Sequence, residues 1–302
     1  MSGTRPQGPF GGVLVALPTP FDHGQIDWPS LRGLIERQLG GGASGVVVGG
    51  STGEATSLAT AERIALFEFT CGLVQGRLQV LAGVGSGDTR VAVELARAAT
   101  RTGADGLLVT TPAYARPPQR GLEAHFGAVA DASELPQMLY NIPARTGVDL
   151  LPETVARLAG RHGHLVALKE SSGSLERVRR LVAEGHVDVF CGDDAEILDH
   201  LEAGAVGVVS VMANLVPGRT RELIEALMAG EQARAGELSE SLRPLIHALT
   251  LETNPGPLKA ALDLLGLAGS ETRLPLVPIE DATRTRVAAA LVDGGLCGRQ
   301  SP

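Results

Sequence analysis

The sequence contains few lysines, aromatic residues and cysteines. Of its 26 basic residues only Lys169 and Lys259 are lysines, and aromatic residues make up 3% of the 302 residues. The three cysteines are far apart, a spacing that offers neither a disulfide framework nor a zinc knuckle. We therefore expect a reducing compartment, and for this chain the cytoplasm.

The chain also lacks an excess of positive charge and long apolar runs. The formal net charge is −8, whereas a general nucleic-acid-binding protein normally carries a basic face. No apolar stretch reaches the roughly 20 residues that a membrane-spanning helix needs. The first twelve residues are rich in Gly and Pro and do not have the pattern of a secretory signal. We expect neither a nucleic acid nor a membrane as a partner.

Short apolar runs alternate with helical patterns along most of the chain. The runs are nearly continuous in hydrophobicity, which is typical of parallel strands buried on both faces. The expected strands are 13–17, 45–48, 80–84, 106–109, 137–140, 165–168, 187–191 and 206–211. The helices expected between them are 28–39, 61–74, 90–101, 119–132, 152–159, 175–183 and 195–202, with Thr60, Ser174 and Asp194 as N-caps for three of them.

Eight strands alternating with helices predict a closed (β/α)8 TIM barrel of the α/β class. A doubly wound open sheet is the alternative, but the eighth strand is followed only by helical patterns, at 217–228, 231–249, 257–265 and 280–291. A barrel needs about 250 residues, so the last helices form an appendage. We expect residues 1–225 to form the barrel that carries the active site and residues 226–302 to form C-terminal helices packed on it.

Polar segments follow five of the expected strands. They are residues 49–54, 110–114, 140–145, 169–173 and 192–194. The carboxyl ends of the strands of a (β/α)8 barrel meet at one rim, and that rim is where active sites are built. The sequence therefore predicts one active site assembled from these five segments.

Lys169 follows the apolar run 165–168. A lysine at a strand end can simply reach solvent or pair with a neighbour such as Glu170. Here the preceding run places the amine at the mouth of an apolar barrel, where burial disfavours the ammonium form. A neutral amine is the form of lysine that attacks a carbonyl.

Further polar side chains on the expected rim have both structural and chemical interpretations. Tyr140 and Tyr114 could be core or interface aromatics, but a phenol can also donate and accept protons. Ser51 and Thr52 could cap a turn, or could hold a carboxylate with their hydroxyl and backbone N–H groups. Arg145 could be a surface residue, or could bind a carboxylate in bidentate fashion.

The sequence offers no recognisable cofactor or metal motif. Asp193 and Asp194 are typical of helix caps rather than of metal ligands, and the seven histidines lack a metal-ligand spacing. The glycines at 83–87 do not complete a dinucleotide fingerprint, and the run at 49–54 is not a phosphate-binding loop. We therefore expect no cofactor and no metal.

Three segments are similar to motifs of a known family. They read GSTGE at 50–54, YNIPARTG at 140–147 and LKE at 168–170. With these motifs in this order, the chain resembles the dihydrodipicolinate synthase and N-acetylneuraminate lyase family of class I aldolases. The resemblance runs from about residue 12 to the C-terminal helices. It implies a lyase that binds a 2-oxo acid, pyruvate, as a Schiff base on a lysine.

The resemblance also implies a role for each candidate residue. Lys169 would form the Schiff base, and Tyr140 would shuttle protons with the help of Ser51 and of Tyr114 from the neighbouring subunit. Thr52 and the backbone near Val209 would hold the pyruvate carboxylate. The family further implies a homotetramer built as a dimer of dimers, with Tyr114 crossing the tight dimer interface.

Arg145 and the segment 192–194 are similar to the synthase branch of this family. That branch implies condensation of pyruvate with L-aspartate 4-semialdehyde to 4-hydroxy-tetrahydrodipicolinate, in lysine and diaminopimelate biosynthesis, with Arg145 binding the aldehyde's carboxylate. Ser51 stands where synthases usually have Thr and is the residue of the lyase branch. The alternative is therefore a retro-aldol lyase that releases pyruvate from a sialic acid or a sugar-derived 2-oxo acid.

A third hypothesis is a non-catalytic sensor that binds a small 2-oxo acid. Lys169 and the two tyrosines argue against it, because a sensor needs no such amine. The resemblance also bears on regulation. The positions similar to the family's lysine-feedback pocket are Ala55, Thr56, Thr60, Arg63, Gly87 and Val91. They lack the His, Asn and Glu of lysine-sensitive members, so we expect no strong inhibition by L-lysine.

Overall fold

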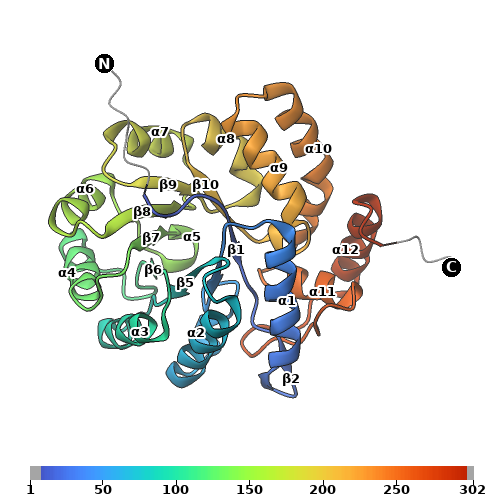
Figure 1. Ribbon diagram of the computed structural model, residues 1–302, viewed down its shortest axis with the longest axis horizontal. Coiled ribbons are helices and arrows are strands. Elements are labelled where there is room, and N and C mark those ends of the chain that lie inside the picture. Colours follow the sequence, from blue (N-terminus) through green and yellow to red (C-terminus); the bar gives the residue numbers. More distant parts are fainter. Residues whose placement is uncertain (1–7, 298–302) are drawn as a thin grey trace.

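The computed structural model describes residues 8–297 and shows a closed barrel of eight parallel strands surrounded by helices (Figure 1). The barrel strands are β1 (Gly12–Ala16), β4 (Gly45–Val48), β5 (Gln79–Gly83), β6 (Gly106–Thr110), β7 (Gln137–Asn141), β8 (Leu165–Glu170), β9 (Asp188–Cys191) and β10 (Gly207–Ser210). Each strand pairs with its neighbours in chain order, and β1 pairs with both β4 and β10 to close the barrel. The prediction of a TIM barrel is confirmed.

Helices follow the barrel strands and cover them from outside. They are α1 (Trp28–Gly41), α2 (Thr60–Val74), α3 (Thr89–Thr102), α4 (Gln119–Ala130), α6 (Pro152–Arg161), α7 (Leu175–Glu184), α8 (Ile197–Glu202) and α9 (Pro217–Met228). Several short elements were not predicted from the sequence, among them the hairpin of β2 (Phe21–Asp22) and β3 (Gln25–Ile26) and the single-turn helix α5 (Pro143–Thr146). Elements of two to four residues are too short to show a hydrophobic period.

Two separate apolar layers stabilise the barrel. Side chains that point inward from the strands, among them Leu14, Leu81, Met138 and Phe190, fill the interior. A larger layer lies between the outer faces of the strands and the helices. Because side chains alternate between the two faces of a strand, a residue at a strand end points either into the mouth of the barrel or outward under the helices.

The N-cap predictions have mixed outcomes. Ser174 caps α7 as predicted, since its side chain accepts a hydrogen bond from the Arg177 backbone N–H. Thr60 is not a cap, because α2 already begins at Thr60. The N-cap is Ala59, whose backbone N–H donates to the Glu62 carboxylate. Asp194 does not cap its own helix either, because its carboxylate accepts from backbone N–H groups just after β10.

Three C-terminal helices lie beside the barrel. They are α10 (Gln232–Leu249), which packs on α9, followed by α11 (Gly256–Leu264) and α12 (Asp281–Asp293) (Figure 1). The expected boundary after residue 225 falls inside α9. Between residues 8 and 297, the structure contains no helix with the length and apolar character needed to cross a membrane.

Candidate active site

The carboxyl ends of the strands open into a cavity of about 330 Å³. The inward-facing side chains at the carboxyl ends of the strands form the floor of this cavity. The loops after the strands and the segment that follows α10 form its walls. The lining includes Ala16, Val47, Leu108, Tyr140 and Val209 from the barrel interior, with Ser51, Thr52, Arg145, Lys169 and Asn254 from the walls. Six of the seven sequence-predicted site residues therefore share one cavity.

Lys169 lies inside this cavity at the end of β8. Its side chain is 6% exposed, and the amine lies 4.2 Å from the centre of the Tyr140 ring. Lys169 and Tyr140 are register partners on adjacent strands, so both point into the barrel mouth. Within residues 8–297 the amine has no ion pair. The amine therefore faces the cavity without a carboxylate partner from the described residues.

Glu170 does not pair with Lys169, which rules out one structural interpretation of the lysine. The Glu170 side chain points outward and is fully buried, and it forms its ion pair with Arg177 instead, at 2.8 Å. The other structural interpretation, a lysine that reaches solvent, conflicts with the 6% exposure of Lys169.

Gly192 makes room for the Lys169 side chain. A Cβ at this position would lie 2.9 Å from the Lys169 Cε atom and would also collide with the Ser171 hydroxyl. Cβ contacts below 3.0 Å require something to shift. The Ser171 hydroxyl is buried at the cavity and, among the described residues, has no hydrogen-bond partner. It is therefore free to bind a ligand.

Ser51 and Thr52 lie in the turn after β4, on the wall of the cavity. Thr52 is buried, and its hydroxyl accepts a hydrogen bond of 3.0 Å from the Asn254 side chain. The turn is closed by a backbone hydrogen bond from Glu54 to Ser51. Asn254 lies 202 residues further along the chain, so the segment after α10 fixes the Thr52 hydroxyl in place.

Arg145 lies on α5, the single helical turn after β7, and its exposed side chain reaches the cavity wall. One of its guanidinium nitrogens donates to the backbone carbonyl of Asn254 at 3.3 Å. None of the described carboxylates forms an ion pair with it. Arg145 is therefore available to an anionic ligand at the opening of the cavity.

Tyr114 is the one predicted site residue that the structure does not bring into the cavity. It lies in the loop after β6 with its side chain 97% exposed, and its backbone N–H donates to the Thr146 carbonyl. Its φ of 72° lies in the left-handed region, which costs a non-glycine residue about 1–3 kcal/mol. Within a single chain Tyr114 takes no part in the site.

The loop after β9 forms an acidic wall of the cavity. Asp193 accepts from the backbone N–H of Ala195, and Asp194 accepts from the N–H groups of Val211 and Met212. Asp193 is the N-cap of the short helical turn that follows it, as predicted, whereas Asp194 does not cap that turn because its carboxylate accepts from backbone N–H groups just after β10. Burial raises the pKa of the Asp194 carboxyl. No group of three or more potential metal ligands occurs in the part of the chain that the structure describes.

The residues that cover the cavity from the C-terminal side were not predicted from the sequence. They are Ile246, Leu249, Thr250, Glu252 and Thr253, from the end of α10 and the following segment. These residues do not follow a barrel strand, so the strand-end rule could not identify them. Asn254 joins this segment to Thr52, and a contact across 202 residues leaves no local signal in the sequence.

Comparisons with known proteins agree with this geometry. The sequence model of the dihydrodipicolinate synthetase family matches residues 9–293. The 4-hydroxy-tetrahydrodipicolinate synthase of Pelobacter propionicus is 43% identical over 289 residues, which cover 95% of this chain and 99% of that protein. The enzyme of the same name from Geobacter metallireducens is 43% identical over 284 residues, 93% of this chain and 98% of that protein.

Solved structures show the same similarity in three dimensions. The dihydrodipicolinate synthase from Aquifex aeolicus superposes with a TM-score of 0.94 at 38% identity, covering 95% of this chain and 99% of that one. The 4-hydroxy-tetrahydrodipicolinate synthase from Methylacidiphilum fumariolicum SolV gives a TM-score of 0.93 at 40% identity, covering 95% and 96%. The chain belongs to the dihydrodipicolinate synthetase family.

Proposed function

We propose that this chain condenses pyruvate with L-aspartate 4-semialdehyde to give 4-hydroxy-tetrahydrodipicolinate, a step of lysine and diaminopimelate biosynthesis. It acts as a lyase of the class I aldolase type. The observation that carries this proposal is the Lys169 amine, buried in the barrel mouth beside Tyr140 and without a carboxylate partner in residues 8–297. Family membership supports the choice of substrates, and the residues of the cavity support the reaction type.

Lys169 begins the reaction as a nucleophile. Its amine adds to the ketone carbon of pyruvate, and loss of water gives an imine. Removal of a proton from the methyl group turns the imine into an enamine. Tyr140, whose ring lies 4.2 Å from the amine, moves the protons of these steps, with Ser51 and a Tyr114 from the neighbouring subunit in support. The full exposure of Tyr114 is what such a crossing residue requires.

Two sites hold the carboxylates of the two substrates. Thr52 on the cavity wall and the backbone at Val209 on the cavity floor bind the carboxylate of pyruvate, and both residues are buried. Arg145 binds the carboxylate of L-aspartate 4-semialdehyde at the opening, because its guanidinium has no carboxylate partner among residues 8–297. The enamine carbon then attacks the aldehyde carbon, which becomes an alcohol. The amino group of the second substrate displaces Lys169 from the imine carbon as the ring closes.

The assembly, the domain division and the compartment are also proposals. We propose a homotetramer built from two tight dimers, with Tyr114 at the tight interface, and a cytoplasmic location. We also propose that residues 1–225 are the catalytic barrel and that residues 226–302 are helices packed on it. Light scattering should give the mass of four chains, and Tyr114→Ala should lower kcat without changing the cavity of its own chain.

Borohydride reduction in the presence of pyruvate tests the function. The imine is reduced to a stable secondary amine, and peptide mass mapping should place the pyruvyl adduct on Lys169. Lys169→Arg should abolish the adduct and lower kcat by at least about 10³-fold, whereas Lys259→Arg should keep the adduct. Absence of an adduct in the parent chain would remove both the synthase and the retro-aldol lyase and leave a sensor. A coupled assay with aspartate semialdehyde separates the two enzymes.

Inhibition by free L-lysine is expected to be weak. Arg63 fills part of a second cavity of about 400 Å³ beside the first, and its guanidinium donates to the carbonyls of Gly83 and Gly85. Burial lowers the pKa of Arg63 to about 10, so the side chain is still a cation at pH 7. A cation there repels the ammonium groups of lysine. An inhibition constant in the low millimolar range would contradict this expectation.

A further inference from the structure

The residues that follow Tyr140 and Lys169 in their strands form a buried polar pair. Asn141 and Glu170 are register partners, as the two catalytic residues are. Because side chains alternate along a strand, this pair points outward while Tyr140 and Lys169 point into the cavity. Both outward side chains are fully buried. Any shift of the outward pair along or across the strands therefore moves the two cavity residues as well.

Asn141 uses its whole side chain in this outward cluster. Its amide nitrogen donates to Oδ1 of Asp149 at 2.8 Å and lies 3.2 and 3.3 Å from the two oxygens of Glu170. Its amide oxygen accepts from the backbone N–H of Leu150 at 3.0 Å. The end of β7 is thus tied both to β8 and to the segment that leads into α6.

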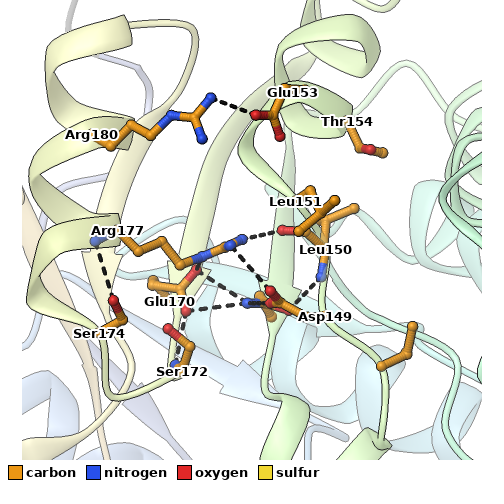
Figure 2. A network of polar contacts seen from close by, with 12 residues as sticks. Asp149, Leu150, Leu151, Glu153, Thr154, Glu170, Ser172, Ser174, Arg177 and Arg180 are labelled. Carbon is orange, nitrogen blue, oxygen red and sulfur yellow. Dashed lines mark hydrogen bonds and ion pairs between the residues drawn. The ribbon is translucent and has the colours of Figure 1, made fainter.

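Arg177 provides the counter-charge for Glu170. Its Nε atom donates to Oε2 of Glu170 at 2.8 Å, and the backbone N–H of Ser172 donates to Oε1, also at 2.8 Å. The guanidinium also lies 3.3 Å from Asp149 and donates to the backbone carbonyl of Leu150 (Figure 2). One planar, forked cation therefore ties the end of β8 to the segment before α6, a geometry that the single ammonium of lysine cannot reproduce.

The cluster is out of reach of the substrates. None of Asn141, Glu170 and Arg177 lines the cavity of the active site. The Arg177 side chain is 10% exposed and that of Glu170 is 0% exposed, so solvent does not screen their ion pair. Any effect that these residues have on the reaction must therefore pass through the strand ends to which they are tied.

We propose that Asn141, Glu170 and Arg177 are positioning residues that hold the Tyr140 ring and the Lys169 amine at their 4.2 Å separation. This inference rests on the proposed function, in which those two residues carry the chemistry. A misplacement of about 1 Å between reacting groups can cost about 10²-fold in rate. A purely structural ion pair would change stability and leave the rate of the folded enzyme unaltered.

A matched pair of variants separates the two possibilities. Arg180 lies one turn after Arg177 on α7 and pairs with Glu153 at 2.6 Å, at the top of the view in Figure 2, and both side chains are about half exposed. We expect Arg177→Lys to lower kcat and the rate of borohydride-trappable imine formation by about 10- to 100-fold, with KM for pyruvate within about twofold of the parent. Arg180→Lys should keep the parent values.

Each outcome decides a separate question. If the parent chain forms no adduct on Lys169, the proposed function and this inference both fail. If the parent forms the adduct and Arg177→Lys forms it at the parent rate, only the positioning role is wrong. Should Arg177→Lys not fold, Glu170→Gln replaces it, since this substitution keeps the shape of the side chain and removes the charge that pairs with Arg177. A folded Glu170→Gln variant with the same trapping rate as Arg180→Lys would overturn the inference.

Discussion

The two lysines of this chain are similarly buried but have different interaction partners. Both are almost fully buried, and each amine lies 4.2 Å from the centre of an aromatic ring, Tyr140 for Lys169 and Phe21 for Lys259. Lys259 forms an ion pair with Glu54 and donates to the backbone carbonyl of Glu271 at 2.7 Å. Lys169 has neither kind of partner among residues 8–297, and it faces a cavity.

Because both lysines are buried, burial alone does not distinguish the roles that we propose for them. Burial lowers the pKa of Lys259, but the Glu54 carboxylate opposes that shift and holds the amine in a salt bridge. Lys259 also stabilises the site indirectly, because Glu54 belongs to the turn that carries Ser51 and Thr52. Lys259 is therefore held in a salt bridge beneath the turn at the cavity, whereas the Lys169 amine faces the cavity itself.

Removing the two amines should change stability by very different amounts, and this is the largest effect that we expect. Lys259→Met leaves the Glu54 carboxylate buried without its partner, which should lower the free energy of unfolding by about 3–5 kcal/mol. Lys169→Met removes an unpaired amine, so stability should stay within about 1 kcal/mol of the parent. Urea unfolding followed by circular dichroism measures both. Equal losses would mean that the two lysines are alike.

Two glycine substitutions, one near each lysine, extend the comparison to the rate of imine trapping. Gly192→Ala places a methyl group 2.9 Å from the Lys169 Cε atom, so the amine must move, and imine trapping should slow by about 10²-fold. Gly256→Ala, on the helix that carries Lys259, meets only the Ile279 side chain at 2.8 Å. Trapping by that variant should stay at the parent rate. A parent-like rate for Gly192→Ala would show that Lys169 is not held against this glycine.

Amine-selective labelling offers a direct comparison of reactivity. Because Lys169 faces an open cavity and lacks an ion pair in the described chain, it should react with a small acylating reagent about tenfold faster than Lys259. Pyruvate should protect Lys169 and leave the slow labelling of Lys259 unchanged. Peptide mass mapping distinguishes the two sites, because the chain has no other lysine. Faster labelling of Lys259 would reverse the assignment.

The same contrast explains how much the sequence could predict. The barrel strands and the rim position of Lys169 were predictable, because a buried parallel strand leaves a continuous apolar run and its end marks the rim. The pair of Glu54 and Lys259 was not, because contacts between residues so far apart in the chain leave no local period. The same reason hid Ile246 and Leu249, which cover the cavity from α10.

Lowering the pH should weaken the contacts around Lys259, because it protonates Glu62. This is the smallest effect that we predict. The Glu62 carboxylate accepts two hydrogen bonds from Arg273, at 2.6 and 2.8 Å, and the backbone N–H of Arg273 donates to Glu54. The hydrogen bonds from Arg273 lower the pKa of Glu62 below its usual value, although burial opposes this shift. Well above the usual pKa of 4.5, the carboxylate is ionised in both the folded and the unfolded chain, and its stabilisation is fully present.

As the pH falls through the lowered pKa, the folded chain takes up the proton that the unfolded chain has already bound, and the stabilisation is lost. Glu62→Gln should therefore lower the Tm at pH 7, by an amount equivalent to about 1 kcal/mol or less for a partly exposed pair. The gap in Tm between the parent and Glu62→Gln should close below pH 4.5. Since Lys169 has no such partner in the described chain, Lys169→Met should give a gap that does not depend on pH in this range. A gap for Glu62→Gln that widens in acid would contradict the role assigned to Arg273.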